Sequence, residues 1–294
     1  MHKKIVIFGE MLWDCFSDKS IPGGAPMNVA LHTQYLGLET SFISRIGNDN
    51  WGKELIGFVE SKSLNTDLVQ VDENYDTSRV LVDDTDKENI KYEIVEPVAW
   101  DFIQWSKDMQ QTVDKADAFI FGSLAARSED SRNTLFKLLE TPVLKILDIN
   151  LRAPYYEASL LKKLLEKADI VKINDDELNL LIDFFKLDKD WGKAIEKLTE
   201  IFELKMVCVT KGSAGAIIFD GEKNYSHPGY KVKVEDTVGS GDAFLSGFIY
   251  KSLSGDSPKE ILDFACALGA LVATNKGGTP QYELEDIASI QKAQ

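Results

Sequence analysis

The segment Val143-Leu-Lys-Ile-Leu-Asp148 is an apolar run that predicts a β-strand, and Ile170-Val-Lys-Ile173 is a second such run. Between them, residues 160–167 carry the apolar spacing of a helix, and another helical pattern follows at residues 175–185. A strand, a helix and a second strand at this spacing form a βαβ unit, in which the two strands lie parallel. This stretch therefore predicts an α/β fold whose mostly parallel sheet is covered by helices on both faces.

The same alternation extends over the rest of the chain. Further strands are predicted at residues 4–8, 40–45, 118–121 and 206–209, and further helices at 28–36, 130–139, 191–202, 240–253 and 258–274. Two β-like segments without an intervening helix, about residues 13–22 and 77–96, are expected to form a small antiparallel sheet that covers the strand ends as a lid. We therefore expect one domain over residues 1–294, with ligands at the carboxyl ends of the parallel strands.

Composition excludes several classes of protein. The 294 residues are 44% hydrophobic and 28% charged, which is typical of a globular chain and not of a disordered or fibrous one. No apolar run approaches the roughly 20 residues of a membrane span, and the first residues lack the long apolar region of a signal peptide. A net charge of −15 argues against nucleic-acid binding. Three scattered cysteines fit a reducing cytoplasm and make no zinc spacing with the histidines.

The densest chemical signal is Asp236-Thr-Val-Gly-Ser-Gly-Asp242, directly before a predicted helix. Gly239 and Gly241 free the backbone to turn, and the helix start adds the positive end of its dipole, so that the segment can bind a phosphate. Asp242 falls in the first turn, where a carboxylate beside a phosphate can accept the proton of an attacking hydroxyl. An ordinary helix start with Asp in its first turn is the alternative.

A second glycine cluster, Pro22-Gly-Gly-Ala-Pro-Met-Asn28, leads into the first helix. It is either an ordinary loop or a place where the backbone approaches a small polar ligand, with Asn28 as both donor and acceptor. Asp14 follows the first strand and is either a surface carboxylate or an acceptor for sugar hydroxyls.

Three further segments follow predicted strands. In Asp148-Ile-Asn-Leu-Arg152, alternate residues share one face if the chain stays extended, and Arg152 is either a surface side chain or a phosphate ligand. Asn174-Asp-Asp-Glu177 has the spacing of a capping box, which is compatible with holding water around Mg²⁺. The segment from Thr210 to Gly215 either lines a nucleotide pocket or is a glycine turn between strands.

Two nucleotide-binding motifs are excluded. Gly47-Asn-Asp-Asn-Trp-Gly-Lys53 has the Gly-x₄-Gly-Lys core of a P-loop, but Glu54 stands where Ser or Thr coordinates magnesium. The first strand is followed by Gly9-Glu-Met-Leu-Trp13 and not by Gly-x-Gly-x-x-Gly, which argues against a Rossmann oxidoreductase.

Four of these motifs occur in the order found in the ribokinase-like (PfkB) carbohydrate kinases, and the resemblance covers nearly the whole chain. They are Gly23-Gly24…Asn28, Asp148-x-Asn-x-Arg152, Asn174-x-x-Glu177 and Asp236-Thr-Val-Gly-Ser-Gly-Asp242. Gly9-Glu10 followed by Asp14, together with Gly23-Gly-Ala-Pro26, looks most like the fructokinase branch.

The resemblance implies a three-layer α/β/α sandwich with a β-sheet lid, and transfer of the γ-phosphate of ATP to a sugar hydroxyl. Fructose is the expected sugar. Kinases of the same family that act on ribose, 2-keto-3-deoxygluconate or a nucleoside are alternatives, as is a catalytically silent sugar sensor. ATP and Mg²⁺ are the implied cofactors, and K⁺ is a further candidate. The exposed strand edges of a lid also make a homodimer through the lid an expectation.

Residue by residue, the resemblance makes Asp242 the catalytic base, with the amides of Gly239, Ser240 and Gly241 as the anion hole. Ser240 stands where Ala is commoner, which leaves the backbone amide unchanged. Arg152 is implied near the transferred phosphate. The remaining implied roles are sugar binding by Asp14, Gly23, Gly24 and Asn28, nucleotide binding by Thr210, Gly212, Gly215 and Asn275, water-mediated Mg²⁺ binding by Asn174 and Glu177, and a monovalent cation held by carbonyls near Asp236 and residues 273–278.

Overall fold

The computed structural model describes residues 3–83 and 91–293. Its larger sheet has the strand order β13-β12-β11-β10-β9-β8-β1-β4-β5. The strands are β1 (Lys4–Phe8), β4 (Glu39–Gly47), β5 (Val69–Asp72), β8 (Ala118–Gly122), β9 (Leu144–Asp148), β10 (Ile170–Asn174), β11 (Met206–Thr210), β12 (Ala216–Phe219) and β13 (Asn224–His227). Neighbours from β5 to β11 are parallel, whereas β12 and β13 pair antiparallel. The predicted mostly parallel sheet is confirmed, although β5, β12 and β13 lie outside the predicted strands.

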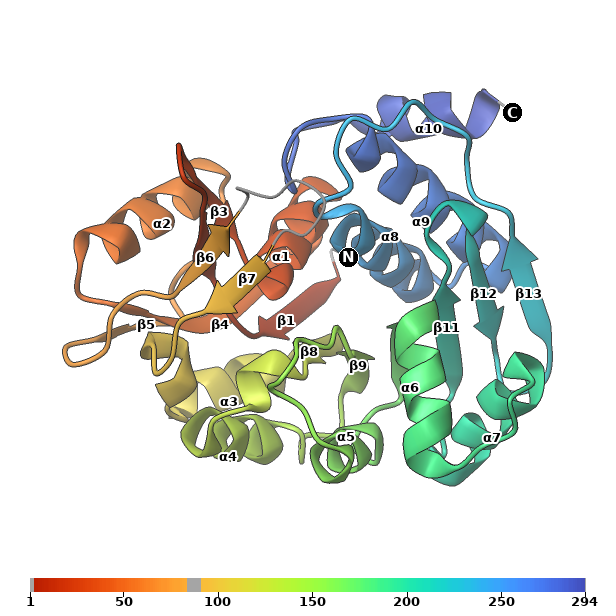
Figure 1. Cartoon of the computed structure of the whole chain (residues 1–294), viewed down its shortest axis with the longest axis horizontal. Helices are drawn as coiled ribbons and strands as arrows, with labels where there is room; N and C mark the ends of the chain where they lie inside the picture. The colour runs from red at the N-terminus through yellow and green to blue at the C-terminus, as the bar shows by residue number, and fades with distance from the viewer. Residues whose placement is uncertain (1–2, 84–90, 294) are drawn as a thin grey trace.

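Both faces of this sheet are apolar, because successive side chains of a strand point to opposite sides. In β1, Ile5 and Ile7 join one buried cluster while Val6 and Phe8 join the other. The first cluster is covered by α1 (Ala25–Tyr35), α2 (Asn50–Ser61), α8 (Ser240–Ser254) and α9 (Pro258–Ala273), with α10 (Leu284–Lys292) packed on α9. The second is covered by α3 (Lys107–Val113), α4 (Glu129–Leu138), α5 (Ala158–Leu165), α6 (Asp175–Phe185) and α7 (Trp191–Phe202). This is the expected α/β/α sandwich (Figure 1).

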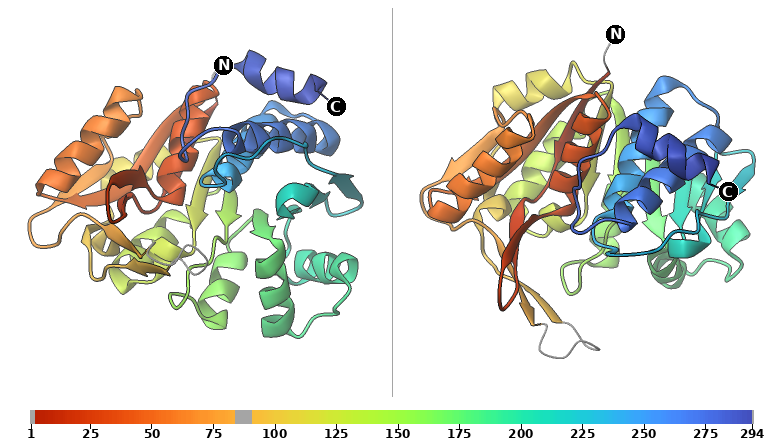
Figure 2. Two further views of the ribbon diagram at one scale, coloured as in Figure 1. Left: turned by 45° about the horizontal axis from the view of Figure 1, so that its top comes forward. Right: turned by 90° about the horizontal axis from the view of Figure 1, so that it is seen from above.

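A second, smaller sheet lies beside the sandwich (Figure 2). It is built from β2 (Leu12–Cys15), β3 (Ser20–Gly23), β6 (Arg79–Asp83) and β7 (Lys91–Ile94), in the order β3-β2-β6-β7. The expectation of an antiparallel sheet is wrong for its centre, because β2 and β6 pair in parallel. The two antiparallel hairpins join through their first strands, which run in the same direction. Residues 84–90, part of the predicted lid, lie outside the described residues.

The connections place β1 at the point where the strand order reverses. From β1 the chain passes through β2 and β3 to β4 on one side, and it later enters β8 on the other side. Ligands of such folds bind at the carboxyl ends of the strands beside this point. Among the described helices, none combines the length and the apolar character needed to cross a membrane.

Candidate active site

The start of α8 is shaped by glycine. Gly239 precedes the helix with a φ of 73°, a left-handed conformation that side chains rarely adopt, and a Cβ there would overlap the carbonyl of Gly278. No side chain caps this end of the helix. The amide of Ser240 donates to the Thr237 carbonyl at 3.2 Å, whereas those of Gly239 and Gly241 have no acceptor among the described residues. The helix start therefore presents unpaired donors to an anion, and the Ser240 amide contributes less than expected.

Asp242 lies beside these donors in the first turn of α8, and it is half-buried. Its Oδ2 accepts a hydrogen bond of 2.8 Å from Nδ2 of Asn28, a buried residue of α1. Burial raises the pKa of Asp242 to about 6; the Asn28 hydrogen bond opposes this rise, and nearby Asp148 reinforces it. A carboxyl with this pKa is mostly ionised at neutral pH and still accepts a proton readily.

A buried ion pair underlies the helix start. Nζ of Lys172 donates to Oδ1 of Asp148 at 3.0 Å, and each side chain is only 8% exposed. A Cβ on Gly241 would lie 3.9 Å from this ammonium. Burial lowers the pKa of Lys172, but Asp148 and Glu177 outweigh that effect, so its pKa stands above the usual value. Sequence reasoning missed Lys172, although a lysine between the apolar residues of a buried strand was the available signal.

The predicted sugar-binding segment is tightly packed. Asp14 lies in β2 opposite Ile21, and a Cβ on Gly23 would overlap its carboxylate. Gly24 has a φ of 109°, and a Cβ there would lie 2.7 Å from the carbonyl oxygen of Glu10. Burial raises the pKa of Asp14 to about 6, and the positive charge of Arg152 opposes the rise. Gly24 is therefore required by its contact with the backbone, whereas a side chain at position 23 would displace the Asp14 carboxylate.

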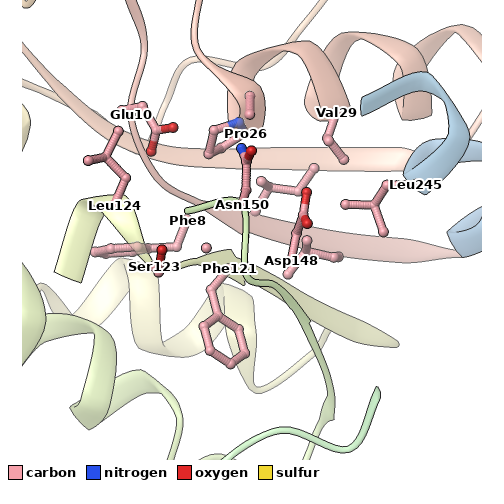
Figure 3. Close-up of a pocket in the computed structure, with 14 residues that line it drawn as sticks. Phe8, Glu10, Pro26, Val29, Phe121, Ser123, Leu124, Asp148, Asn150 and Leu245 are labelled. Carbon is pink, nitrogen blue, oxygen red and sulfur yellow. The ribbon is translucent and has the colours of Figure 1, made fainter. Parts of the chain in front are cut away.

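Glu10 is a buried carboxyl that the site prediction did not include. It is 4% exposed, and burial raises its pKa to about 7 against the opposing charges of Arg152 and Arg127. It borders a cavity of about 20 Å³, room for one water molecule, together with Ser123, Asp148 and Asn150 (Figure 3). Polar side chains from the ends of β1, β8 and β9 thus line the same cavity.

The segment after β9 departs from the prediction. Asn150 has a φ of 40°, so the chain turns there and the alternation of an extended strand ends. Asp148 and Asn150 line the cavity, whereas Arg152 is exposed and donates to the carbonyl of Leu151 at 3.0 Å. The three side chains therefore do not share one face. Arg152 still contributes positive charge near Asp14 and Asp242.

Asn174 and Glu177 form the predicted capping box at the start of α6. Oε2 of Glu177 accepts the amide of Asn174 and Oε1 accepts that of Leu151, both at 2.8 Å. Burial raises the pKa of Glu177, and Lys172 opposes this. In the part of the chain that the structure describes, no three His, Cys, Asp or Glu side chains are grouped to hold a metal ion. These residues fit an ion held through water and not one bound directly.

The remaining predicted residues lie at the end of β11 and on loops. Thr210 pairs with Asn174 in the strand register, and Gly212 to Gly215 make the turn between β11 and β12, as the alternative interpretation expected. Asp236 accepts amides of Val238 at 3.0 Å and of Gly277 at 3.1 Å, and so joins two loops.

Two more loops have structural roles. The side-chain amide of Asn275 donates to the Leu271 carbonyl at the end of α9. The excluded P-loop segment is closed by its own chain: Asp49 caps α2 through the Gly52 amide and also accepts from Thr77, while a Cβ on Gly47 would lie 2.6 Å from the Thr77 nitrogen. No room for a phosphate remains in that turn.

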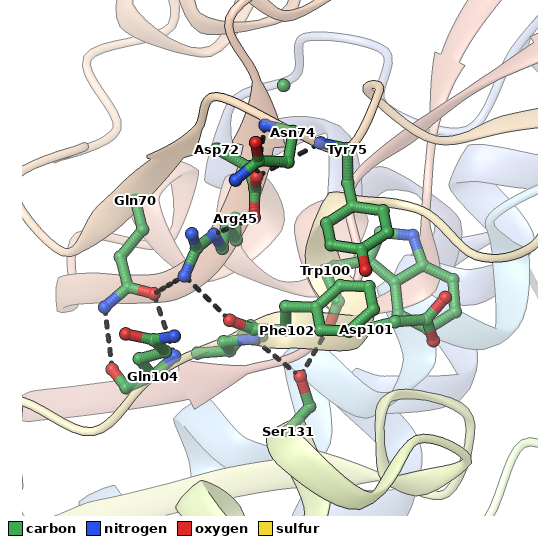
Figure 4. Close-up of polar contacts among 12 residues, drawn as sticks. Arg45, Gln70, Asp72, Asn74, Tyr75, Trp100, Asp101, Phe102, Gln104 and Ser131 are labelled. Atoms are coloured by element: carbon green, nitrogen blue, oxygen red, sulfur yellow. Dashed lines mark hydrogen bonds and ion pairs between the residues drawn. The ribbon is translucent and has the colours of Figure 1, made fainter.

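The chain that leaves β7 is anchored to the sheet edge (Figure 4). Arg45 of β4 forms an ion pair of 2.7 Å with the buried Asp72 and donates to the carbonyl of Phe102 at 2.8 Å. Ser131 of α4 accepts the amide of Ile103 and donates to the carbonyl of Trp100. The small sheet is thereby attached to a rigid part of the sandwich.

Comparison with known proteins places the chain in a family. The model of the pfkB family carbohydrate kinases matches residues 2–284, and the chain belongs to this family. It is 32% identical to the probable fructokinase-5 of Arabidopsis thaliana over 94% of this chain and 93% of that protein. It is therefore a carbohydrate kinase, a phosphotransferase that acts on sugars.

Solved structures share the fold. The fructokinase of Xylella fastidiosa with bound ATP superposes with a TM-score of 0.87 at 23% identity, over 99% of this chain and 98% of that one. A fructokinase double mutant from Vibrio cholerae O395, bound to fructose, ADP and potassium, gives a TM-score of 0.85 at 23% identity, over 99% and 98%. These similarities establish the ribokinase-like fold.

Proposed function

We propose that this protein is an ATP-dependent fructokinase. The observation that carries the proposal is the contact between Asp242 and Asn28 at the uncapped start of α8. It brings a carboxylate with a raised pKa and unpaired backbone donors next to Asn28, which follows the glycines of the predicted sugar site. The 32% identity to a probable fructokinase supports fructose as the acceptor.

In the proposed reaction, Asp242 accepts the proton of a sugar hydroxyl as that oxygen attacks the γ-phosphorus of ATP and ADP leaves. The amides at the start of α8 stabilise the negative charge of the transferred group, and Arg152 adds positive charge nearby. Asn28 holds the carboxylate in place through its 2.8 Å hydrogen bond. The small sheet covers the strand ends and excludes water that would otherwise accept the phosphate.

Substrate and ion binding follow the same proposal. Asp14, Gly23, Gly24 and Asn28 bind the sugar, and Thr210, Gly212, Gly215 and Asn275 border the nucleotide. Asn174 and Glu177, whose carboxylate already accepts two amides, would hold Mg²⁺ through water, and the ion would supply positive charge to the phosphates. Carbonyls of the two loops that Asp236 joins would hold K⁺.

A coupled assay of ADP release tests this function across fructose, ribose, adenosine and 2-keto-3-deoxygluconate. We expect fructose to give the highest kcat/KM. Asp242→Asn should lower kcat by about 10²–10⁴-fold with both substrates still bound, as expected on loss of a general base. Asp183→Asn, which removes an exposed carboxyl of α6, is the charge-matched control. Fructose binding without ADP release would identify a sugar sensor, and preference for another acceptor would reassign the substrate.

The small sheet also carries the proposed dimer interface. Leu81 and Tyr92 are 44% and 62% exposed on it, and β3 and β7 are its edges. Light scattering on the purified protein should give a dimer that Leu81→Glu dissociates; a monomeric wild-type protein would contradict this.

The compartment and the kind of partner follow from the thiols and the net charge. Cys208 and Cys266 are buried free thiols, which fits the cytoplasm as the compartment of this protein. The net charge of −15 fits small-molecule partners better than nucleic acid.

A further inference from the structure

His32 is a fully buried histidine outside every motif described above. Its Nε2 lies 2.9 Å from the carbonyl oxygen of Gly278, and its Nδ1 lies 3.0 Å from the hydroxyl of Tyr282. Because a carbonyl only accepts hydrogen bonds, Nε2 must carry the proton, and Nδ1 accepts from the tyrosine. Burial lowers the pKa of His32 to about 4, so the ring is neutral and both nitrogens are satisfied.

Gly278, the partner of His32, lies against the catalytic groups. Its backbone is so close to Gly239 that a Cβ on Gly239 would overlap it. A Cβ on Gly278 itself would lie 3.2 Å from Nδ2 of Asn28, the nitrogen that donates to Asp242. The Gly278 peptide therefore contacts both the start of α8 and Asn28, so a shift of this peptide would disturb both.

Helix α1 holds both contacts. Asn28 and His32 are four residues apart and so lie on the same face of the helix, one turn after the other. Asn28 contacts the carboxylate of Asp242, and His32 contacts the backbone that supports the start of α8. One helix thus supports both the base and the backbone that packs against the anion site.

We propose that His32 is a positioning residue for phosphoryl transfer, acting through Gly278 on the start of α8 and on the Asn28–Asp242 pair. This inference rests on the proposed kinase function. It assigns a task to a buried polar side chain of α1, and it makes Tyr282 the group that orients the ring.

The aromatic surroundings provide a matched control. The ring of Tyr282 stacks on His32 at 5.6 Å, and Tyr35 packs edge-on against both rings at 5.8 and 6.1 Å. The Tyr35 hydroxyl is buried and has no partner among the described residues. Tyr282→Phe removes the hydroxyl that orients His32, whereas Tyr35→Phe removes one that orients nothing and keeps the same packing.

The test compares steady-state kinetics of four variants with wild type, using ATP and fructose. His32→Leu should lower kcat by about 10- to 100-fold, the scale of a misplaced catalytic group, with KM for fructose changed less than about twofold. His32→Gln, whose amide can donate to Gly278, should recover most of this loss. Tyr282→Phe should lower kcat by a smaller factor, and Tyr35→Phe should not lower it.

Thermal unfolding with and without a non-hydrolysable ATP analogue separates positioning from folding. The inference would be overturned if, across all four variants, the loss of kcat were proportional to the loss of melting temperature. A wild-type kcat in His32→Leu would also overturn it. If His32→Leu does not fold, the contrast between Tyr282→Phe and Tyr35→Phe decides. A wild-type protein inactive on every acceptor would refute the proposed function instead, and the effect of His32→Gln and Tyr282→Phe on the analogue-induced melting shift would then test the inference.

Discussion

Replacing Glu10 by Gln should stabilise the folded protein at neutral and alkaline pH. Glu10 is 4% exposed, and burial raises its pKa from 4.5 to about 7 despite the positive charges of Arg152 and Arg127. The folded state therefore keeps this proton between pH 4.5 and 7, where the unfolded chain has released it. Stability from this group is present below pH 4.5 and is lost as the pH rises toward 7.

The size of the effect follows from that interval. The span from 4.5 to about 7, at about 1.4 kcal/mol per pH unit, corresponds to about 3 kcal/mol of unfolding free energy. A neutral glutamine avoids this cost at every pH. The variant should therefore be about 3 kcal/mol more stable than wild type at pH 8 and almost equal to it at pH 4.

Urea unfolding at several pH values between 4 and 8 measures the difference. Glu54→Gln, which removes one exposed carboxylate from α2, controls for net charge. If Glu10→Gln is less stable than wild type at pH 8, the ionised carboxylate makes a net favourable contact with its arginines, and the conclusion that burial dominates at this position is wrong.

Three further predictions concern the same region. The kcat/KM should rise with pH through about 6, because Asp242 must be ionised to accept a proton; a rate flat from pH 5 to 8 would contradict this. Lys172→Met leaves Asp148 buried without a partner and should cost about 3–5 kcal/mol in chemical denaturation, whereas adding Asp148→Leu should restore much of it, and equal stability of both variants would contradict this. Gly239→Ala should reduce kcat strongly, because its Cβ would overlap Gly278 in a left-handed backbone; unchanged kinetics would show that the helix start tolerates a shift.

Local patterns were enough to predict the sandwich. Apolar runs such as Ile170-Val-Lys-Ile173 alternate with helical stretches, and this periodicity depends only on which side of the backbone each residue occupies. The strand β13 was missed because it is a short, polar edge strand, whereas β12 is apolar but only four residues long and follows β11 through a turn without an α-helix. Parallel pairing of β2 and β6 could not be predicted, because it depends on how two hairpins distant in sequence meet.

Most elements of the sandwich and the glycine-rich start of α8 could be predicted from the amino-acid sequence, since backbone freedom and hydrophobic period are local properties. Which side chains meet at that helix start depends on how distant segments pack. Asn28 reaches Asp242 across 214 residues, and Lys172 reaches the same region from inside the sheet. Contacts of this kind arise from the packing of α1 and α8 on one face, and no local pattern specifies them. For the same reason the turn at Asn150, which leaves Arg152 exposed, became visible only in the folded chain.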